Sequence, residues 1–368
     1  MKSTSKLGRP RLLVVGCGDI GMRCIPLLRE RFRVFAMTRD TARVAALRQA
    51  GALAVIADLD MRHSLRRIAA LAPYILHLAP PPASGIVDYR TQALLAALGA
   101  HRAAASKRSG PTRYTARYTA HFAAPRAAKG VHQASHGRVR LAGSAAAAWA
   151  GKLRLPAAAH RLNIVPEQCM PRMFPVLAYG STSGVYGDCA GALVDETRTP
   201  QPANARAVRR ISAERQLRKA GARGALSLSI IRIPGIYAAD RLPLARLKAG
   251  TPALRRDDDV FTSHIHADDL AAIMCRALRR GRPQRIVHAA DDTRMKMGDY
   301  FDLVADRHSL PRPPRIAREQ ADQLLPANLL SFMRESRQLD NTRLKRELRI
   351  QLRYPDVAGF FERQAALK

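Results

Sequence analysis

Short apolar runs alternate with amphipathic stretches over the first hundred residues of the chain. Four runs are rich in Leu, Val, Ile and Ala and have polar or small residues at their ends: 11–16, 34–37, 53–57 and 74–78. Such runs are typical of parallel strands that are buried on both faces. Three stretches of helical period lie between them: 20–32, 41–50 and 61–71. This alternation predicts right-handed crossovers and an α/β fold, a doubly wound parallel sheet of the Rossmann type.

The alternation stops after a helical stretch that ends near Ala100. Over residues 101–171, Ala, Arg, His, Ser and Gly dominate and apolar periodicity is weak. We expect a long flexible insertion here, with a short helix around 145–153. The pattern then resumes with a strand, a helix and a further strand: 174–179, 203–220 and 227–233. The sequence therefore predicts one dinucleotide-binding Rossmann domain, residues 9–233, interrupted by the insertion at about 101–171.

The last third of the chain, residues 234–368, has a different pattern. It consists of loops and short helices, with one further apolar strand at 285–289. We expect a smaller C-terminal substrate lobe. No stretch approaches the roughly 20 apolar residues of a membrane-spanning helix, and no signal-peptide pattern opens the chain. The five cysteines have no metal-like spacing. A cytoplasmic protein with neither a membrane anchor nor a metal site is expected.

A glycine-rich motif follows the first predicted strand and opens the first predicted helix. It reads Gly16-Cys17-Gly18-Asp19-Ile20-Gly21, and its strand and helix context is the one that dinucleotide binding requires. Gly16 permits a tight turn, Gly18 lets the backbone approach a pyrophosphate, and Gly21 lets the helix pack close to the strand. The phosphates would lie at the helix N-terminus, where free N–H groups favour anions. Asp19 and Ile20 belong to the same predicted cofactor contact.

The residues after the second predicted strand bear on the choice between NAD and NADP. An NAD site usually offers a carboxylate to the ribose 2′-hydroxyl here, but the sequence has Thr38 and Arg39. A guanidinium suits a 2′-phosphate, and Arg23 on the first helix would add a second positive charge. This pattern favours NADP, with NAD as the alternative. The alternative is that Arg39 is an ordinary surface residue and that Asp40 only caps the next helix.

Further motifs follow the glycine motif in order along the chain. The first is Asp58-Leu59, which is placed to meet the adenine edge of the cofactor or to form a plain turn. Three more are Ser-Thr-Ser-Gly-Val-Tyr-Gly at 181–187, Arg-Ile-Pro-Gly-Ile-Tyr at 232–237 and His-Ile-His-Ala-Asp-Asp-Leu at 264–270. Together they resemble atypical extended short-chain dehydrogenases/reductases, the NAD-dependent epimerases/dehydratases that act on nucleoside-diphosphate sugars. The resemblance implies a bound nicotinamide cofactor, with Pro234 among its contacts, and hydride transfer on a carbonyl or alcohol.

The resemblance accounts for only part of the expected catalytic machinery. Thr182 matches the family's hydroxyl that polarises the substrate oxygen. The family's Tyr-x-x-x-Lys pair needs a phenol whose pKa is lowered by the nearby ammonium. Glu214 resembles the family's glutamate four residues after the Lys. Counting back from it places Arg210 at the Lys position and Arg206 at the Tyr position. Arg210 can still position the ribose, but Arg206 cannot donate a proton because a guanidinium stays protonated.

Two hypotheses follow from the missing pair. In the first, the protein is an oxidoreductase or epimerase and another acid or base replaces the tyrosine: Tyr186, Tyr237, His264 or His266. Each of these side chains can equally be structural. In the second, the chain binds NADP without turning it over, as a sensor or scaffold whose basic insertion meets a partner.

The formal net charge of +33 bears on the kind of partner. Residues 101–172 hold thirteen Lys and Arg residues against one acid, Glu167, so nucleic acid is an option through the insertion. Aromatic residues make up only 5% of the chain and no nucleic-acid motif occurs, which favours a small-molecule carbonyl or sugar-nucleotide substrate. The resemblance also implies a homodimer as an option.

Cations cluster where relatives of this kind admit substrate. The residues expected around that loop are Arg232, Tyr237, Arg241, Arg246 and Lys248. They suit an anionic ligand such as a nucleotide sugar, because arginine binds phosphate with two parallel N–H groups, or they are surface charge. A late stretch, 331–344, is expected to serve packing.

Overall fold

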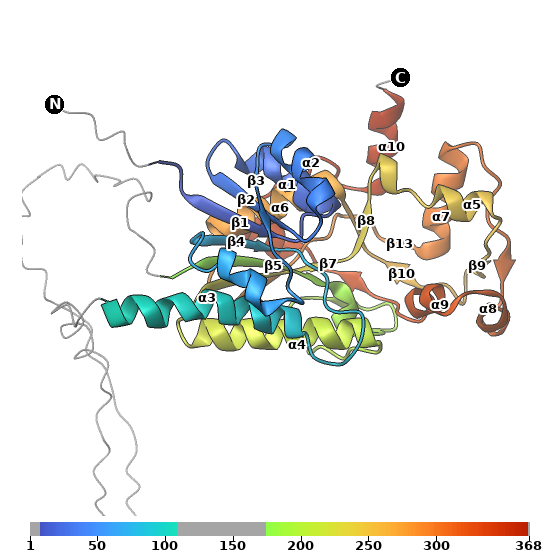
Figure 1. Ribbon diagram of the computed structural model, residues 1–368. Coiled ribbons are helices and arrows are strands. Elements are labelled where there is room, and N and C mark those ends of the chain that lie inside the picture. The colour runs from blue at the N-terminus through green and yellow to red at the C-terminus, as the bar shows by residue number, and fades with distance from the viewer. Residues whose placement is uncertain (1–7, 109–173, 367–368) are drawn as a thin grey trace, which may run out of the picture. The chain divides into compact units, whose positions relative to one another are not determined.

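The computed structural model describes residues 8–108 and 174–366 (Figure 1). The chain divides into two units, one made of Met1–Ala105 with Met173–Lys368 and the other of Ser106–Arg172. The second unit falls almost entirely outside the described residues, and so does the helix expected around 145–153. In the described part of the chain, no helix combines the length and the apolar character needed to cross a membrane.

A seven-stranded sheet forms the centre of the larger unit. Its strand order is β12-β7-β5-β4-β1-β2-β3, and all neighbouring pairs are parallel. The strands are β1 (Arg11–Val15), β2 (Arg33–Thr38), β3 (Leu53–Ile56), β4 (Tyr74–His77), β5 (Val176–Thr182), β7 (Ser227–Ile233) and β12 (Arg285–His288). The order reverses between β1 and β4, and open α/β sheets bind ligands outside the carboxyl ends of their strands at such a point. The predicted Rossmann-type fold is confirmed.

Helices cover both faces of this sheet. In β1, Leu12 and Val14 pack on one side while Leu13 and Val15 pack on the other, and all four side chains are fully buried. Figure 1 shows α1 and α6 on one face and α3 and α4 on the opposite face. The helices around the sheet are α1 (Asp19–Leu28), α2 (Val44–Gln49), α3 (Tyr89–Arg108), α4 (Ala205–Ala222) and α6 (Ala267–Arg280). Burial on both faces explains why β1 is a continuous apolar run.

Two predicted helix boundaries are wrong. The helix expected to end near Ala100 continues as α3 through Arg108, because the Ala-rich and Arg-rich residues 101–108 have high helix propensity. The helix expected at 61–71 is only a 3₁₀ turn at Arg62–Arg67. There the Ser64 hydroxyl donates to the Asp58 and Met61 carbonyls, and such local bonds compete with an α-helix.

The chain after residue 233 contributes to the sheet and also forms a smaller lobe. β12 pairs with β7, and α6 packs against α1, so these two elements belong to the Rossmann layers. The predicted boundary at residue 233 therefore does not separate sheet from lobe. The lobe surrounds a separate apolar cluster that includes Tyr237, Phe301 and Phe360.

The lobe is built from short elements. Its helices are α5 (Leu244–Lys248), α7 (Met297–Arg307), α8 (Arg318–Leu324), α9 (Ala327–Met333) and α10 (Val357–Ala365). Its strands pair two by two: β8 (Gly235–Tyr237) with β11 (His264–His266), β9 (Ala253–Leu254) with β14 (Arg315–Ile316), and β10 (Phe261–Thr262) with β13 (Met295–Lys296). A further pair joins β6 (Leu193–Val194) to β15 (Gln338–Leu339) and links the segment after β5 to a segment of the lobe.

Candidate functional site

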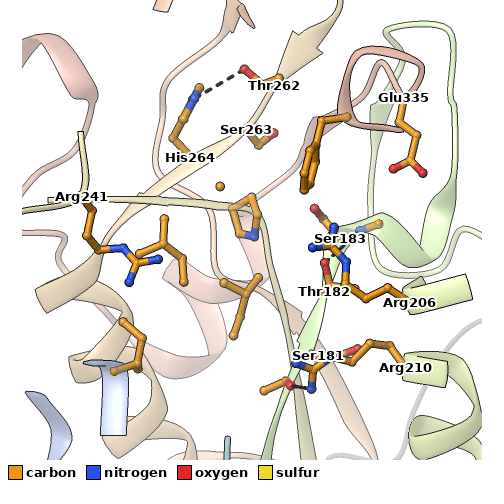
Figure 2. A pocket seen from close by; sticks show the side chains of 18 of the residues that line it. Ser181, Thr182, Ser183, Arg206, Arg210, Arg241, Thr262, Ser263, His264 and Glu335 are labelled. Atoms are coloured by element: carbon orange, nitrogen blue, oxygen red, sulfur yellow. Dashed lines mark hydrogen bonds between the residues drawn. The ribbon is translucent and has the colours of Figure 1, made fainter. Parts of the chain in front are cut away.

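A cavity of about 710 Å³ lies at the carboxyl ends of β1, β5 and β7 (Figure 2). This volume is typical of a ligand pocket. Its walls come from the glycine motif, the end of β5, α4 and the lobe. They include Gly16, Gly18, Asp19, Ile20, Gly21, Thr182, Ser183, Arg206, Arg210, Pro234, Arg241, His264, Tyr300, Phe332, Glu335 and Arg337. The predicted cofactor loop and the predicted reaction centre therefore share one cavity.

The three glycines of the motif have different surroundings. Gly16 has a φ of +95°, and a Cβ there would lie 2.3 Å from the Ala79 nitrogen. A Cβ on Gly21 would lie 2.6 Å from the Gly16 carbonyl oxygen. Around Gly18, no atom of the described residues lies within 4 Å of the equivalent position. Gly18 also precedes α1 without a side-chain cap, so the open space meets free backbone N–H groups and fits the phosphates of a dinucleotide.

Arg23, the expected second cation for a 2′-phosphate, is committed to carboxylates. Its guanidinium pairs with Asp19 at 2.8 Å, Asp268 at 2.8 Å and Asp240 at 2.9 Å. Asp19 also accepts from Arg241 at 2.9 Å. The contacts use all three guanidinium nitrogens of Arg23. Arg23 therefore ties α1 to α6 and to the turn at 239–241, and the structure does not support its predicted role.

The end of β2 presents its cations differently from the sequence expectation. Thr38 is buried, and its hydroxyl bonds to the Asp40 backbone at 3.2 Å. Arg39 is exposed. Neither Thr38 nor Arg39 lines the cavity. The Asp40 carboxylate caps the following turn. Arg43, which the sequence analysis missed, donates to the Cys17 carbonyl of the glycine motif at 2.6 Å. Its only sequence signal was a basic residue in the first turn after β2.

Asp58 and Leu59 lie outside the cavity. Leu59 is buried in the core beneath the sheet. The Asp58 carboxylate accepts the Asp60 N–H at 3.0 Å, which is the geometry of a local turn. Of the two sequence interpretations, the structure favours the plain turn.

Thr182 ends β5 and faces the cavity. Its Oγ1 accepts the Gly184 N–H at 3.2 Å, which leaves the hydroxyl proton available to a ligand oxygen. The neighbouring Ser181 donates to Glu214 at 2.5 Å, and Glu214 pairs with Arg232 at 2.8 Å. Both partners of this ion pair are almost fully buried, so the pair holds the end of β5 that presents Thr182.

Arg206 and Arg210 also line the cavity, one turn apart on α4. The Arg210 Nη1 donates to the Gly180 carbonyl at 2.8 Å and to the Tyr179 hydroxyl at 3.1 Å. The Arg206 guanidinium lies over the Phe332 ring, 4.8 Å from its centre. The positions where the resemblance implies a phenol and an ammonium thus hold two guanidinium groups inside the cavity.

Tyr186 does not reach the cavity. It is fully buried, its hydroxyl accepts from Arg232 at 2.7 Å, and it bonds to His288 Nε2 at 2.5 Å. Burial raises its pKa to about 12. A phenol in this place cannot exchange a proton with a ligand, so the predicted catalytic role of Tyr186 is not supported. Tyr237, the other candidate phenol, is also buried and does not line the cavity.

The two candidate histidines are held as neutral side chains. His264 lines the cavity, whereas His266 caps α6 by accepting the Asp268 N–H at 3.2 Å. Burial lowers the pKa of each imidazole to about 4. A base of that strength is poorly matched to proton transfer near neutral pH.

Most of the residues expected around the substrate loop do not line the cavity. Only Arg241 of that group lines the cavity. Arg232 is buried beside Glu214, Arg246 stacks on Phe301 at 4.1 Å, and Lys248 is exposed.

Glu335 and Arg337, from the stretch expected to serve packing, line the cavity instead. The Glu335 carboxylate accepts from Arg337 at 2.8 Å and from Asn204 at 2.9 Å. A Cβ on Gly184 would lie 3.8 Å from Glu335 Oε2 and 3.6 Å from Thr182 Oγ1. The carboxylate and the hydroxyl therefore both lie close to Gly184. Nothing in the local sequence distinguished this acid, because it reaches the cavity from a distant segment.

Comparisons with known proteins concern the fold and part of the chain. A model of the NAD dependent epimerase/dehydratase family matches residues 116–290, in agreement with the family resemblance. No curated protein matches the chain.

Three solved structures illustrate the shared fold. A functionally unknown conserved protein from Silicibacter pomeroyi is 24% identical, with a TM-score of 0.65 over 97% of this chain and 98% of that one. The dTDP-glucose 4,6-dehydratase from Streptomyces venezuelae, a double mutant with NAD bound, is 16% identical, with a TM-score of 0.62 over 97% and 96%. The UDP-N-acetylglucosamine 4-epimerase from Bacillus cereus is 12% identical, with a TM-score of 0.59 over 97% and 98%.

Proposed function

We propose that this chain, whose residues 116–290 match the NAD dependent epimerase/dehydratase family, binds NADP(H), with NAD(H) as the alternative. We propose further that it acts as an oxidoreductase or epimerase on a carbonyl or sugar-nucleotide substrate. The observation that carries the proposal is the single cavity that joins the open side of Gly18 to Thr182. The NAD-bound dehydratase of similar fold supports a nicotinamide cofactor.

The cofactor and three parts of the cavity have separate roles in the proposed reaction. A bound nicotinamide supplies the hydride donor or acceptor. Gly18 and the start of α1 hold the phosphates, and the Thr182 hydroxyl donates a hydrogen bond to the substrate oxygen. Arg210, fixed by the Gly180 carbonyl, adds positive charge at the end of β5.

Proton transfer falls to Glu335 in this proposal. Its carboxylate and the Thr182 hydroxyl both lie close to Gly184 in the cavity, and Arg206 and Arg210 cannot release a proton at ordinary pH. The Arg337 and Asn204 contacts hold Glu335 in place, and its Oε2 would accept the proton of a substrate hydroxyl as the hydride leaves.

Cofactor titration tests the first half of the proposal. Calorimetry and nicotinamide fluorescence with NADPH and NADH should show tighter binding of NADPH. Arg43→Gln and Arg39→Gln should reduce that preference, by roughly 10-fold for a lost charge-assisted contact. Arg48→Gln is the matched control, because Arg48 is exposed on α2, the helix that follows β2. Failure to bind either nucleotide overturns the proposed function.

Turnover tests the second half. Nicotinamide absorbance and product analysis would be followed with a panel of nucleoside-diphosphate sugars and simple carbonyls. With a substrate found, Glu335→Gln should lower kcat by roughly 100-fold or more and leave KM nearly unchanged. A fall in binding without a fall in kcat would assign Glu335 to substrate contact instead.

The second candidate function is a sensor or scaffold that binds NADP without turning it over. The two arginines in place of the Tyr-Lys pair favour it. A chain that lacks residues 109–171 separates the hypotheses. A sensor with a basic partner module would keep cofactor binding and lose salt-sensitive retention on nucleic acid.

A further inference from the structure

The arginines of the cavity differ in their partners. Two are neutralised within the fold: Arg241 by Asp19 at 2.9 Å, and Arg337 by Glu335 at 2.8 Å. Within residues 8–108 and 174–366, Arg206 and Arg210 form no ion pair. The cavity therefore presents two guanidinium groups that form no ion pair with these residues, one turn apart on α4. Burial and the charge of Arg210 lower the pKa of Arg206, and the charge of Glu335 opposes this only in part.

The position of these two groups suits one shared ligand group. Four residues apart on a helix, they lie on the same face. The contacts of Arg210 with the Gly180 carbonyl and the Tyr179 hydroxyl use Nη1, so Nε and Nη2 stay available. The Arg206 guanidinium lies over the Phe332 ring, and this contact uses none of its N–H groups as hydrogen-bond donors to a protein oxygen. Figure 2 shows both side chains extending from α4 toward Thr182, Ser183 and Ser181.

The positive charges of Arg206 and Arg210 favour an anionic ligand group. Like charges four residues apart on a helix repel, and a neutral sugar hydroxyl would not relieve that repulsion. A planar carboxylate would, because it accepts two N–H groups from a guanidinium in a fork-like geometry. Glu335 forms its ion pair with Arg337, so its charge acts on Arg206 without a direct ion pair.

We infer that the substrate is a nucleotide sugar whose sugar carries a carboxylate, and that Arg206 and Arg210 bind this carboxylate beside Thr182. The inference rests on the proposed function, since it takes the Thr182 end of the cavity as the reacting end. It concerns an anionic group separate from the diphosphate of the same ligand and from the phosphates of the cofactor.

Calorimetric titration in excess NADP tests the inference with three probes that differ stepwise: UDP-glucuronate, UDP-glucose and UDP. UDP-glucuronate should bind roughly 10- to 100-fold more tightly than UDP-glucose, the range expected for hydrogen bonds to a charged group. Arg206→Gln should remove most of that difference, and Arg206→Lys should keep part of it. Arg215→Gln is the matched control, because Arg215 is exposed on α4 and lies outside the cavity.

The other outcomes are informative in different ways. Equal affinities for UDP-glucuronate and UDP-glucose would overturn the inference and leave the proposed function intact. If Arg206→Gln weakens all three probes equally, the arginines bind the diphosphate and the inference is wrong. If none of the probes binds the folded protein while NADP does, this inference is wrong for uridine diphosphate sugars and the cofactor part of the proposed function stands. Circular dichroism of each variant verifies folding.

Discussion

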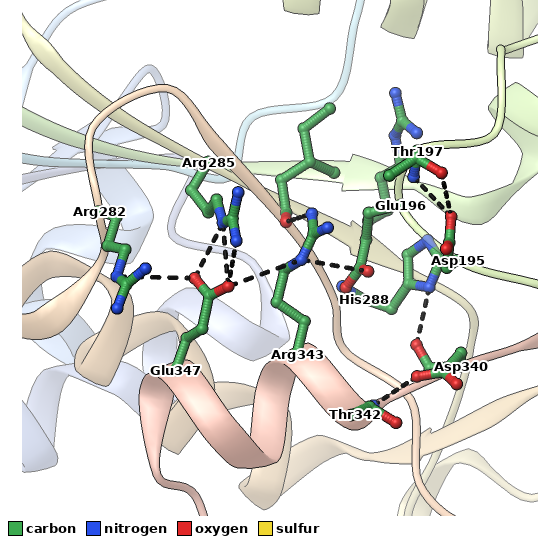
Figure 3. Close-up of polar contacts among 12 residues, drawn as sticks. Asp195, Glu196, Thr197, Arg282, Arg285, His288, Asp340, Thr342, Arg343 and Glu347 are labelled. Carbon is green, nitrogen blue, oxygen red and sulfur yellow. Dashed lines mark hydrogen bonds and ion pairs between the residues drawn. The ribbon is translucent and has the colours of Figure 1, made fainter. Parts of the chain in front are cut away.

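Two groups of arginines in this protein are used in opposite ways. Beside the edge strand β12, three arginines surround the Glu347 carboxylate: Arg282, Arg285 and Arg343 (Figure 3). Glu347 pairs with Arg285 and lies 3.8 Å from Arg343, which reaches Glu196 at 3.4 Å. In the cavity, the two arginines that α4 contributes form no ion pair with any residue that the structure describes.

The edge cluster continues into the buried interior. The His288 N–H donates to Glu196 at 2.9 Å, and the ring bonds to the Asp340 carbonyl and to Tyr186. Through Tyr186 the network reaches the buried ion pair between Arg232 and Glu214. Arginines of this network join strands and turns that lie far apart in the sequence.

The comparison explains why the net charge of +33 alone indicates so little about function. A guanidinium that meets a carboxylate inside the fold contributes to stability. One that faces a cavity without a partner is free to bind a ligand. Removing carboxylates from the network should therefore destabilise the protein, whereas changes at the cavity should alter binding.

The largest effect is expected for Glu214→Gln. It leaves the Arg232 guanidinium, only 1% exposed, without its counter-charge. The free energy of unfolding should fall by about 3–5 kcal/mol, measured by urea denaturation. Glu362→Gln, at an exposed position of α10, serves as the control. A loss below about 1 kcal/mol would contradict the structural role of the pair.

Gly18→Ala should separate binding from stability. Its φ of −70° accepts alanine and the Cβ meets no protein atom, so the free energy of unfolding should change by less than about 1 kcal/mol. NADPH affinity should fall about 10-fold or more, equivalent to about 1.4 kcal/mol, because the methyl group occupies the approach of the phosphates. Gly99→Ala, also in open space, should leave affinity unchanged. Unaltered NADPH binding by Gly18→Ala would place the phosphates elsewhere.

Glu347→Gln should cost about 1 kcal/mol at pH 7, because its partners are partly exposed and solvent screens the pairs. The hydrogen bond from Arg285 holds the pKa of Glu347 below its usual value of about 4.3. The stabilisation is therefore fully present above that pH and is lost as the pH falls through the folded-state pKa. Thermal unfolding from pH 7 to pH 3 should show the difference between wild type and variant shrinking. A difference of the same size at pH 3 as at pH 7 would exclude the ion pair as its cause.

The smallest effect on stability is expected for Arg206→Gln. Removing one of two neighbouring positive charges should change the free energy of unfolding by no more than about 0.5 kcal/mol, toward higher stability. Urea denaturation without ligand measures this. A loss above about 1 kcal/mol would assign Arg206 to the structure, through its contact with Phe332.

Local patterns predicted much of the frame. The apolar run of β1 and the Gly16, Gly18 and Gly21 spacing identified the strand, the turn and the helix, because strand, turn and helix are contiguous in the sequence. Thr182 was predicted by the resemblance of its motif and lies in the cavity. The order of the motifs also indicated the family that matches residues 116–290.

The roles of other side chains depended on partners that are remote in sequence. Arg23 was expected to face a phosphate, but Asp240 and Asp268 come from the lobe and from α6 to neutralise it. Tyr186 sits in a promising motif, yet β7 and β12 bury its hydroxyl against Arg232 and His288.

By itself, the sequence determined the strand and helix alternation, the glycine loop and the absence of a phenol at position 206, because each is a property of contiguous residues. Only the tertiary structure decided which charges are neutralised and which acid lies beside Thr182. Glu335 comes from a segment far along the chain, and periodicity reports whether a residue is buried but not which distant group it meets.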